Sequence, residues 1–435
     1  MSNFQITLII IFSAIAIVAI LIFSGILPGY KTSGGGVAIG PTVTIWSPFS
    51  APGLNKLFDD LNLANKELFS INHINKRKTS YESDLLNALA SAKGPDAWFI
   101  SQDTLLSYKD KIYSTPFSSF PPRTFKDSFI DYAELFLDNQ SQSVDAVPVV
   151  VDPLVLYWNR DLFASAGIAE TPKYWDEFLT SSQRLTSKDG AGNINQSGTA
   201  MGGYDNVKNA KEIISLLVLQ AGNSIVDHDT MRVVFGDKGQ AVINPAEGAL
   251  SFFNEFSNPK KAAYSWNASL YQSDEIFVQG KLAMYFGYAS EYPNIKQRNP
   301  HLNFDVAVVP QIRPADTTQW VSSTYGKIYS VVISKASNQR QAILSAIFKM
   351  TESDFAVPFA DMFYMAPVRR SVLAQGSEDP VASIFYKSAI MTRSWLEPNS
   401  KAVDNIFKNM IDATVTGRLD VPRAVRGVKS QLGEL

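Results

Sequence analysis

The chain has 435 residues, 46% of them hydrophobic and 18% charged, and its 39 basic and 41 acidic residues give a formal net charge of −2. This composition excludes a largely disordered chain, the length predicts two lobes, and the lack of a basic surplus excludes a general nucleic-acid binder. No Cys and only three His are present, so we expect no disulfide, no thiolate site and no His-based catalytic or metal centre.

An almost wholly apolar segment, residues 6–27, follows a short tail of residues 1–5 and contains no charged side chain. At a rise of 1.5 Å per residue it spans about 33 Å, enough for the hydrocarbon core of a bilayer. We favour an uncleaved single-pass transmembrane anchor, because the segment is longer than the apolar region of a signal peptide and no basic side chain precedes it. The alternative is a cleaved signal peptide, which would leave the folded part secreted. Residues 28–41 have the composition of a flexible Gly/Ser linker.

Beyond the linker, strand and helix patterns alternate. Apolar runs predict strands and helical spacing predicts helices, over residues 43–46 (strand), 54–69 and 81–92 (helices), 97–100 (strand), 210–219 and 246–256 (helices), 304–309 and 329–333 (strands) and 339–350 (helix). The last forty residues read as helices with breaks. Strand, helix and strand in succession predict a parallel α/β sheet.

The apolar run of residues 147–156 is split by Asp152 and Pro153. Because proline lacks the N–H that a central strand needs, we expect the chain to leave one element there, at a crossing between lobes. A buried carboxylate without a partner is costly, so Asp152 is expected either to be capped or to face a ligand cleft.

Candidate ligand contacts are aromatic residues at junctions of loops and strands. Ligands of open α/β sheets bind beyond the carboxyl ends of strands, and aromatic faces stack on the C–H faces of sugars. The candidates are Trp46, Trp98, Tyr204, Tyr288, Trp320 and Tyr325. For each of them core packing is the alternative, and the pattern leaves it open.

No phosphate loop, dinucleotide-binding glycine motif or serine nucleophile motif occurs. Asp59 and Asp60 are expected to lie on a solvated helix face, and residues 227–229 (Asp-His-Asp) in a solvated loop rather than a metal site. We therefore predict no enzyme activity, no cofactor and no metal.

Six segments occur in a characteristic order: residues 43–46 (VTIW), 94–99 (GPDAWF), 146–163 (beginning AVP and ending LYWNRDLF), 166–178 (AGI and PKYWDEF), 280–284 (GKLAM) and 366–370 (APVRR). Together they resemble the extracellular solute-binding proteins of ABC transporters, family 1, of the maltose-binding type. The resemblance implies a two-lobed periplasmic-binding-protein fold of type II with discontinuous lobes. It places residues 42–150 with 311–350 in one lobe and 151–310 with 351–435 in the other, with crossings near Val151, Pro310 and Met350.

The resemblance also implies a ligand held between the lobes, closure by hinge bending, and release without chemical change. Asp103 and Asp152 stand at the positions of family acidic residues that accept hydrogen bonds from sugar hydroxyls. Trp46 and Ser47 stand where some sugar binders carry a charged pair, and we include both among the candidate contacts.

These inferences predict a membrane-tethered extracytoplasmic receptor. It would capture a sugar or oligosaccharide and deliver it to the permease subunits of an ABC transporter. One alternative is a sensory or interaction protein that uses the same lobes to read a peptide, a cell-wall fragment or a protein partner. Another is a hydrolase on a two-lobed scaffold.

Overall fold

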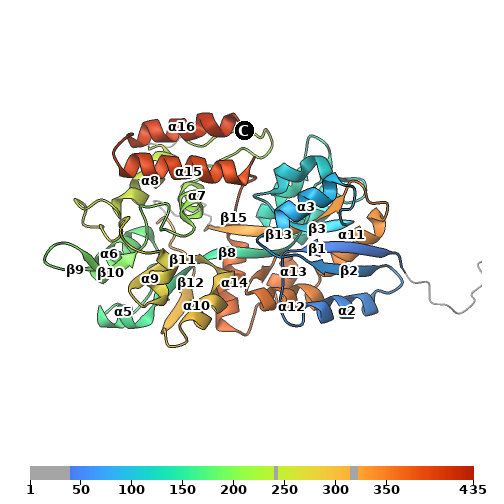
Figure 1. Ribbon diagram of the computed structural model, residues 1–435, viewed down its shortest axis with the longest axis horizontal. Helices are drawn as coiled ribbons and strands as arrows, with labels where there is room; N and C mark the ends of the chain where they lie inside the picture. The colour runs from blue at the N-terminus through green and yellow to red at the C-terminus, as the bar shows by residue number, and fades with distance from the viewer. Residues whose placement is uncertain (1–39, 240–242, 314–321) are drawn as a thin grey trace, which may run out of the picture.

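The computed structural model describes residues 40–239, 243–313 and 322–435, and it shows two lobes lying side by side along the longest axis (Figure 1). The tail and the apolar segment expected over residues 1–27 lie outside these ranges, as do residues 28–39 of the expected linker and Trp320. Within the described ranges, no helix combines the length and the apolar character that crossing a bilayer requires.

A twelve-stranded sheet runs through both lobes, with the main order β2-β1-β3-β13-β8-β11-β10-β9. Its strands are β1 (Thr42–Ser47), β2 (Ser70–Asn75), β3 (Ala97–Ser101), β4 (Ile112–Tyr113), β8 (Val147–Asn159), β9 (Ser187–Lys188), β10 (Ile194–Thr199), β11 (Leu282–Tyr288), β12 (Phe304–Ala307), β13 (Thr324–Ser334), β14 (Ala366–Pro367) and β15 (Thr392–Arg393). A small second sheet consists of β5 (Thr115–Pro116), β6 (Leu137–Asp138) and β7 (Ser143–Val144). Because β1 pairs in parallel with β2 and β3, the predicted parallel α/β unit is confirmed.

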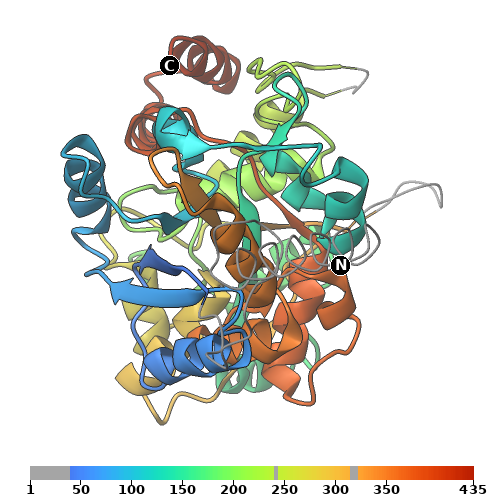
Figure 2. The ribbon, with the colours of Figure 1, turned by 90° about the vertical axis from the view of Figure 1, so that its right-hand side faces the viewer.

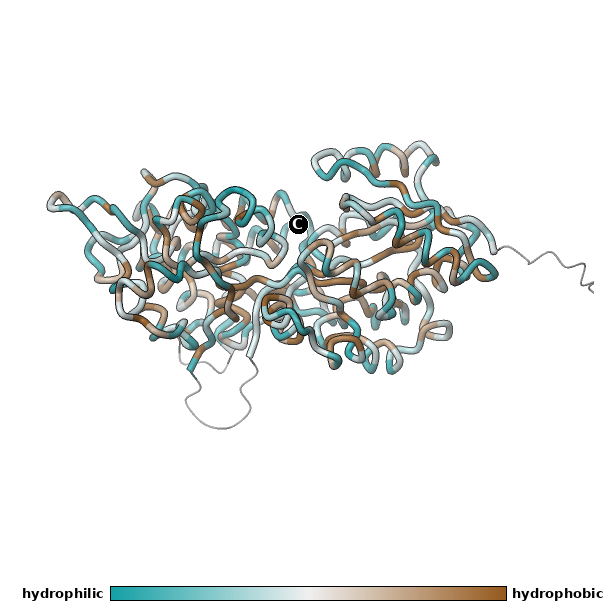
Figure 3. Tube along the Cα trace, turned by 90° about the horizontal axis from the view of Figure 1, so that it is seen from below, coloured by the Kyte–Doolittle hydropathy of each residue, from teal (hydrophilic) through white to brown (hydrophobic). Residues whose placement is uncertain are grey.

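Helices cover the sheet. The α-helices are α2 (Leu54–Ala64), α3 (Tyr81–Ala90), α4 (Pro122–Ser128), α5 (Arg160–Ser165), α6 (Trp175–Leu185), α7 (Ala210–Gln220), α8 (Pro245–Glu255), α9 (Ser273–Val278), α10 (Tyr292–Arg298), α11 (Arg340–Met350), α12 (Ser353–Phe363), α13 (Arg370–Leu373), α14 (Pro380–Ile390), α15 (Ser400–Val415) and α16 (Val421–Gly433). The 3₁₀ helices of the described ranges are η1 (Leu105–Lys111), η2 (Asp131–Phe136) and η3 (Ala289–Glu291). Apolar residues run along the strands inside each lobe, while hydrophilic residues dominate the outer helices (Figure 3).

Strand β8 links the two halves of the sheet. Residues 147–153 pair with β13, and residues 154–159 pair with β11 and β12. The expectation that the chain leaves the strand at Pro153 is wrong, because β8 continues through it. Pro153 lies opposite Gly326, the last pair on β13, and Leu154 opens the ladder with β11. At this change of partners the missing N–H of proline is tolerated.

Two other boundaries differ from the sequence expectation. Helix α2 ends at Ala64 and not at residue 69, and the strand β2 that follows was not predicted. Strand β13 begins at Thr324, five residues before the predicted start. Both segments mix polar and apolar residues without a clear period, and pairing with neighbouring strands decides their structure.

Helix α12 packs on the lobe that contains β1–β3. The ring of Phe355 lies 5.1 Å from that of Phe58 on α2, and Phe359 stacks on Phe99 of β3 at 5.7 Å between ring centroids. These contacts favour counting α12 with this lobe, which we call the first lobe, whereas the sequence expectation assigned residues 351–435 to the second. Helices α15 and α16 lie against α7 and α8 of the second lobe (Figure 1).

Candidate ligand-binding cleft

A cavity of about 1020 Å³ opens beyond the carboxyl ends of β1, β2 and β3. The loops that follow these strands, the start of α3 and part of β13 form its wall in the first lobe. Ser290, Pro293 and Ser400 contribute the wall from the second lobe. This is the position at which ligands bind in open α/β sheets, and the volume lies near the upper end of the range for small-molecule sites.

Aromatic side chains form an apolar part of the cavity wall. Phe49 and Tyr329 both line the cavity, with ring centroids 5.0 Å apart in an edge-to-face arrangement. Tyr81 also lines the cavity, and its hydroxyl donates a hydrogen bond shared between the carbonyl oxygens of Trp46 and Phe99, at 3.2 and 2.7 Å. This bond ties the first turn of α3 to β1 and β3 and so fixes the position of the Tyr81 ring.

An ion pair between Asp103 and Lys327 lies on the same wall. Lys327 Nζ is 2.7 Å from Asp103 Oδ2, and the Ser101 hydroxyl donates to the other carboxylate oxygen. Burial would raise the pKa of Asp103, but the charge of Lys327 and these hydrogen bonds outweigh it, so the pKa lies below its usual value. The cavity therefore presents an ionised carboxylate with a fixed cation beside it.

Asp152 supports the cavity wall from behind. Its side chain is 3% exposed, and its two oxygens accept hydrogen bonds from Ser290, from N at 3.0 Å and from Oγ at 2.6 Å. Burial raises the pKa of Asp152 to about 7 despite these bonds. Ser290 lines the cavity and Asp152 does not, so the carboxylate acts on the cavity through the serine.

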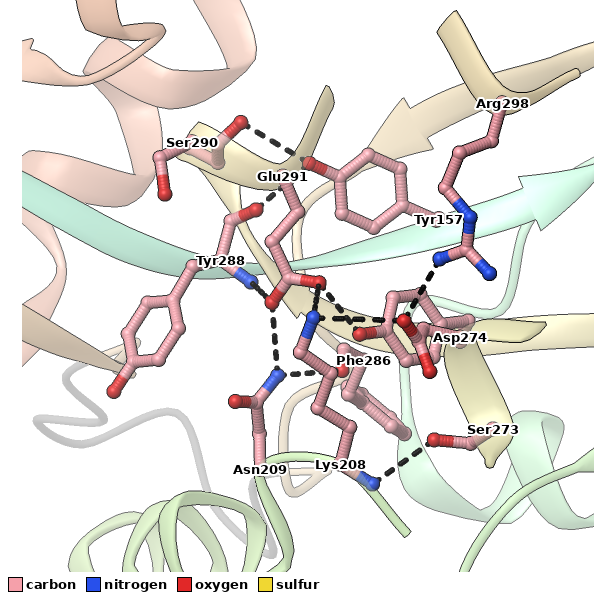
Figure 4. A network of polar contacts seen from close by, with 12 residues as sticks. Tyr157, Lys208, Asn209, Ser273, Asp274, Phe286, Tyr288, Ser290, Glu291 and Arg298 are labelled. Atoms are coloured by element: carbon pink, nitrogen blue, oxygen red, sulfur yellow. Dashed lines mark hydrogen bonds and ion pairs between the residues drawn. The ribbon is translucent and has the colours of Figure 1, made fainter. Parts of the chain in front are cut away.

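A polar network centred on Glu291 fixes the turn that carries Ser290 (Figure 4). Glu291 Oε1 accepts hydrogen bonds from the backbone N of Tyr288 and from Asn209 Nδ2, both at 3.1 Å. Glu291 Oε2 accepts from the Tyr285 hydroxyl at 2.7 Å and lies 2.9 Å from Lys208 Nζ. These four partners come from two separate segments, residues 208–209 and strand β11, so the network positions η3 independently of any ligand.

The structure brings together part of the predicted site. Asp103 lines the cavity, and Asp152 bonds to the cavity residue Ser290. Tyr288 is close to this group, with its ring centroid 5.9 Å from Lys327 Nζ. Tyr325 lies two residues before Lys327 on β13 and is buried.

The other predicted contacts within the described ranges do not line the cavity. Trp98 is fully buried, so its side chain packs in the core. Core packing was the alternative that the sequence pattern left open for it. Trp46 is also buried, with Lys76 Nζ 3.9 Å from its ring centroid. Ser47 Oγ lies 2.7 Å from Nε2 of His73. Tyr204 is half-buried in the second lobe, beside Lys408.

Sequence reasoning missed the loop of residues 76–78 (Lys-Arg-Lys), which lines the cavity between β2 and α3. The sequence shows three consecutive basic residues at this point. Because β2 was not predicted, they could not be placed at the carboxyl end of a strand, where ligands bind. It also missed Phe49, Tyr81 and Tyr329. No local pattern separates these aromatic residues from those of the core.

Comparisons with known proteins show similarity at the level of sequence. The family model of bacterial extracellular solute-binding proteins matches residues 78–352, more than half of the chain. Relatives from Brucella abortus and Brucella suis, named only as binding proteins, are 21% identical over 295 residues, 66% of this chain and 65% of their own length. The match thus spans less than two thirds of these relatives.

Among solved structures, the cyclic alpha-maltosyl-1,6-maltose binding protein from Arthrobacter globiformis has a TM-score of 0.73 at 16% identity, covering 91% of this chain and 99% of its own. A sugar-binding protein from Xanthomonas citri has a TM-score of 0.70 at 20% identity, covering 90% and 96%. At these identities the likeness concerns the fold, and it confirms the predicted two-lobed α/β architecture.

Proposed function

Because the chain belongs to the family of bacterial extracellular solute-binding proteins, we propose that it captures a sugar or oligosaccharide between its lobes and delivers it to the permease of an ABC transporter. The observation that carries this proposal is the cavity beyond β1–β3, whose wall combines residues of both lobes. The structural relatives whose names specify sugars support the choice of ligand class.

The cavity offers the groups that sugar recognition needs. The Asp103 carboxylate accepts hydrogen bonds from hydroxyl groups, and Tyr329 and Phe49 offer aromatic surfaces to C–H faces. A ligand that reaches Ser290 and Asp103 at once contacts both lobes. Since only the closed arrangement makes both sets of contacts, the ligand stabilises closure, and its release reverses it.

Binding is tested by thermal shift and calorimetry on the full chain against a panel of neutral and charged oligosaccharides, peptides and polyamines. A ligand that binds the folded state raises the melting temperature by mass action. Ser50 lines the cavity and is exposed, so S50W fills the opening and should abolish the shift. The matched change S118W, at an exposed serine of the same lobe away from the cavity, should leave it intact. A panel without any binding sugar contradicts the proposal, and binding of peptides alone favours the sensory alternative.

We include tethering in the proposal: residues 6–27 hold the folded part at the outer face of the cell membrane, where the permease lies. Membrane fractionation of the full chain checks this, with a protease added to intact cells from outside. Recovery of a shorter chain in the medium would instead indicate cleavage as a signal peptide.

A further inference from the structure

Three consecutive basic residues, Lys76, Arg77 and Lys78, line the cavity on the side of the first lobe. Arg77 and Lys78 are exposed, and Lys76 is half-buried with its ammonium over the ring of Trp46. Within residues 40–239, 243–313 and 322–435, no carboxylate lies within the 4.0 Å ion-pair distance of any of the three. Their charges are therefore available to a ligand in the cavity.

The acidic residues of the cavity do not neutralise this group. Asp103 is paired with Lys327, which leaves the two carboxylates of Glu82 and Asp84 against the three basic side chains of residues 76–78. The cavity wall therefore keeps one positive charge in excess. The excess is local, because the whole chain carries a formal charge of −2. Half-enclosed walls of low dielectric constant concentrate such a field inside a cleft.

Residues 76–78 also lie directly before α3, whose first turn faces the same cavity. The Ser80 side chain makes no hydrogen bond to a backbone N–H of that turn. A helix start carries a partial positive charge, but Glu82 and Asp84 lie in the same turn and offset it, so the positive field comes from the three basic side chains.

We propose that the sugar bound in this cavity carries an anionic group, a carboxylate or a phosphate ester, which Arg77 and Lys78 bind. The inference rests on the proposed function and narrows its ligand class to acidic sugars. The Arg77 guanidinium binds either group through two parallel hydrogen bonds, and Lys78 adds a mobile cation beside it. The neutral part of the sugar would lie on Phe49 and Tyr329, with a hydroxyl group at Asp103.

Calorimetry on the full chain with matched pairs of sugars tests the inference. One pair is trigalacturonate and its carboxyl-reduced neutral counterpart, and the other is maltotriose 6-phosphate and maltotriose. We expect the anionic member of at least one pair to bind at least about tenfold more tightly at low ionic strength, and the advantage to shrink as salt is added. The pair that shows the advantage identifies the anionic group as carboxylate or phosphate.

The double variant R77Q/K78Q should bring the ratio of the two affinities close to one. The matched variant K93Q removes a positive charge from an exposed site of the same lobe outside the cavity, and it should leave the ratio unchanged. Equal affinities within both pairs overturn the inference and leave the proposed function standing, as does a preference that persists in R77Q/K78Q. Failure of every sugar to bind, neutral or anionic, overturns both.

Discussion

Ser290 donates two hydrogen bonds to Asp152, from Oγ to Oδ2 at 2.6 Å and from N to Oδ1 at 3.0 Å. One partner lies on the cavity wall in the second lobe, and the other lies at the point where β8 changes its pairing from β13 to β11. A residue of the ligand-facing turn is thus bonded to the strand that links the lobes. If the lobes rotate about β8, the hydrogen bonds between Asp152 and Ser290 keep this part of the cavity wall attached to the strand.

The raised pKa of Asp152 should make the free energy of unfolding decrease as the pH rises. Its pKa is about 7 in the folded chain and near 4 when unfolded, so folding takes up a proton between these values. The contribution is fully present below about pH 4 and is lost as pH rises through about 7. We expect the melting temperature to decrease by a degree or more (~1–3 °C) between pH 5 and pH 8 for this reason. D152N, which cannot ionise, should show a smaller decrease, and an identical profile contradicts the assignment.

Replacing Lys327 by methionine should leave the Asp103 carboxylate buried without its partner. Breaking such a pair costs about 3 kcal/mol in the free energy of unfolding at neutral pH, measured by urea denaturation. Because the pKa of Asp103 is lowered in the fold, the stability it contributes is present above about pH 4 and is lost as pH falls through its folded pKa. The difference between K327M and wild type should therefore shrink in acid. In the K327M background, D103N should restore part of the lost stability.

Glu291 should position the ligand-facing turn. E291A removes the acceptor of the Tyr288 N–H and the Tyr285 hydroxyl, and we expect about 2–3 kcal/mol of destabilisation together with weaker ligand binding. E275A, at an exposed glutamate of nearby α9 outside the cavity, serves as the control and should change neither quantity. Reduced stability with unaltered affinity would limit Glu291 to a structural role.

Trp46 should matter more for stability than for direct contact with the ligand. The side chain is only 9% exposed, so W46A should cost about 3 kcal/mol in the free energy of unfolding. Loss of the ring also removes the support of Lys76, whose Nζ lies 3.9 Å from its centroid, so affinity should decrease modestly. Unchanged stability with strongly reduced affinity would instead show that Trp46 contacts the ligand directly, as the sequence predicted.

A contact between the lobes lies on the side away from α3. Asn139 Nδ2 donates to Asp229 Oδ1 at 3.0 Å, and Gln140 Nε2 donates to the Asp229 carbonyl at 3.1 Å. In Figure 2, α3 lies at the left and the segment around residue 229 at the right. Closure around a ligand at the cavity would separate this rear contact. D229A should therefore raise affinity about two- to threefold, since the closed state no longer loses a surface hydrogen bond. Weaker binding by D229A would show that the rear contact favours closure.

Local pattern in the sequence was sufficient for several of the longer elements. The short apolar run of residues 43–46 predicted β1, and helical patterns with breaks were predicted for the last forty residues, where α15 and α16 lie. Such periods record which face of one element is buried, and each chain segment carries this information by itself. The order of the six short segments carries the resemblance to a family, and this resemblance predicted the two-lobed arrangement.

Assignment of residues to the cavity needed the tertiary structure. Trp98 and Phe49 are both aromatic residues at strand ends, yet Trp98 is fully enclosed and Phe49 reaches the cavity. Asp103 and Asp152 stand in comparable motifs, and pairing across β13 and η3 gives them different partners, Lys327 and Ser290. Burial and hydrogen bonding depend on groups that are distant in the chain. The sequence by itself therefore determined several elements and, through the resemblance, the two-lobed architecture, whereas tertiary packing alone decided which side chains a ligand can meet.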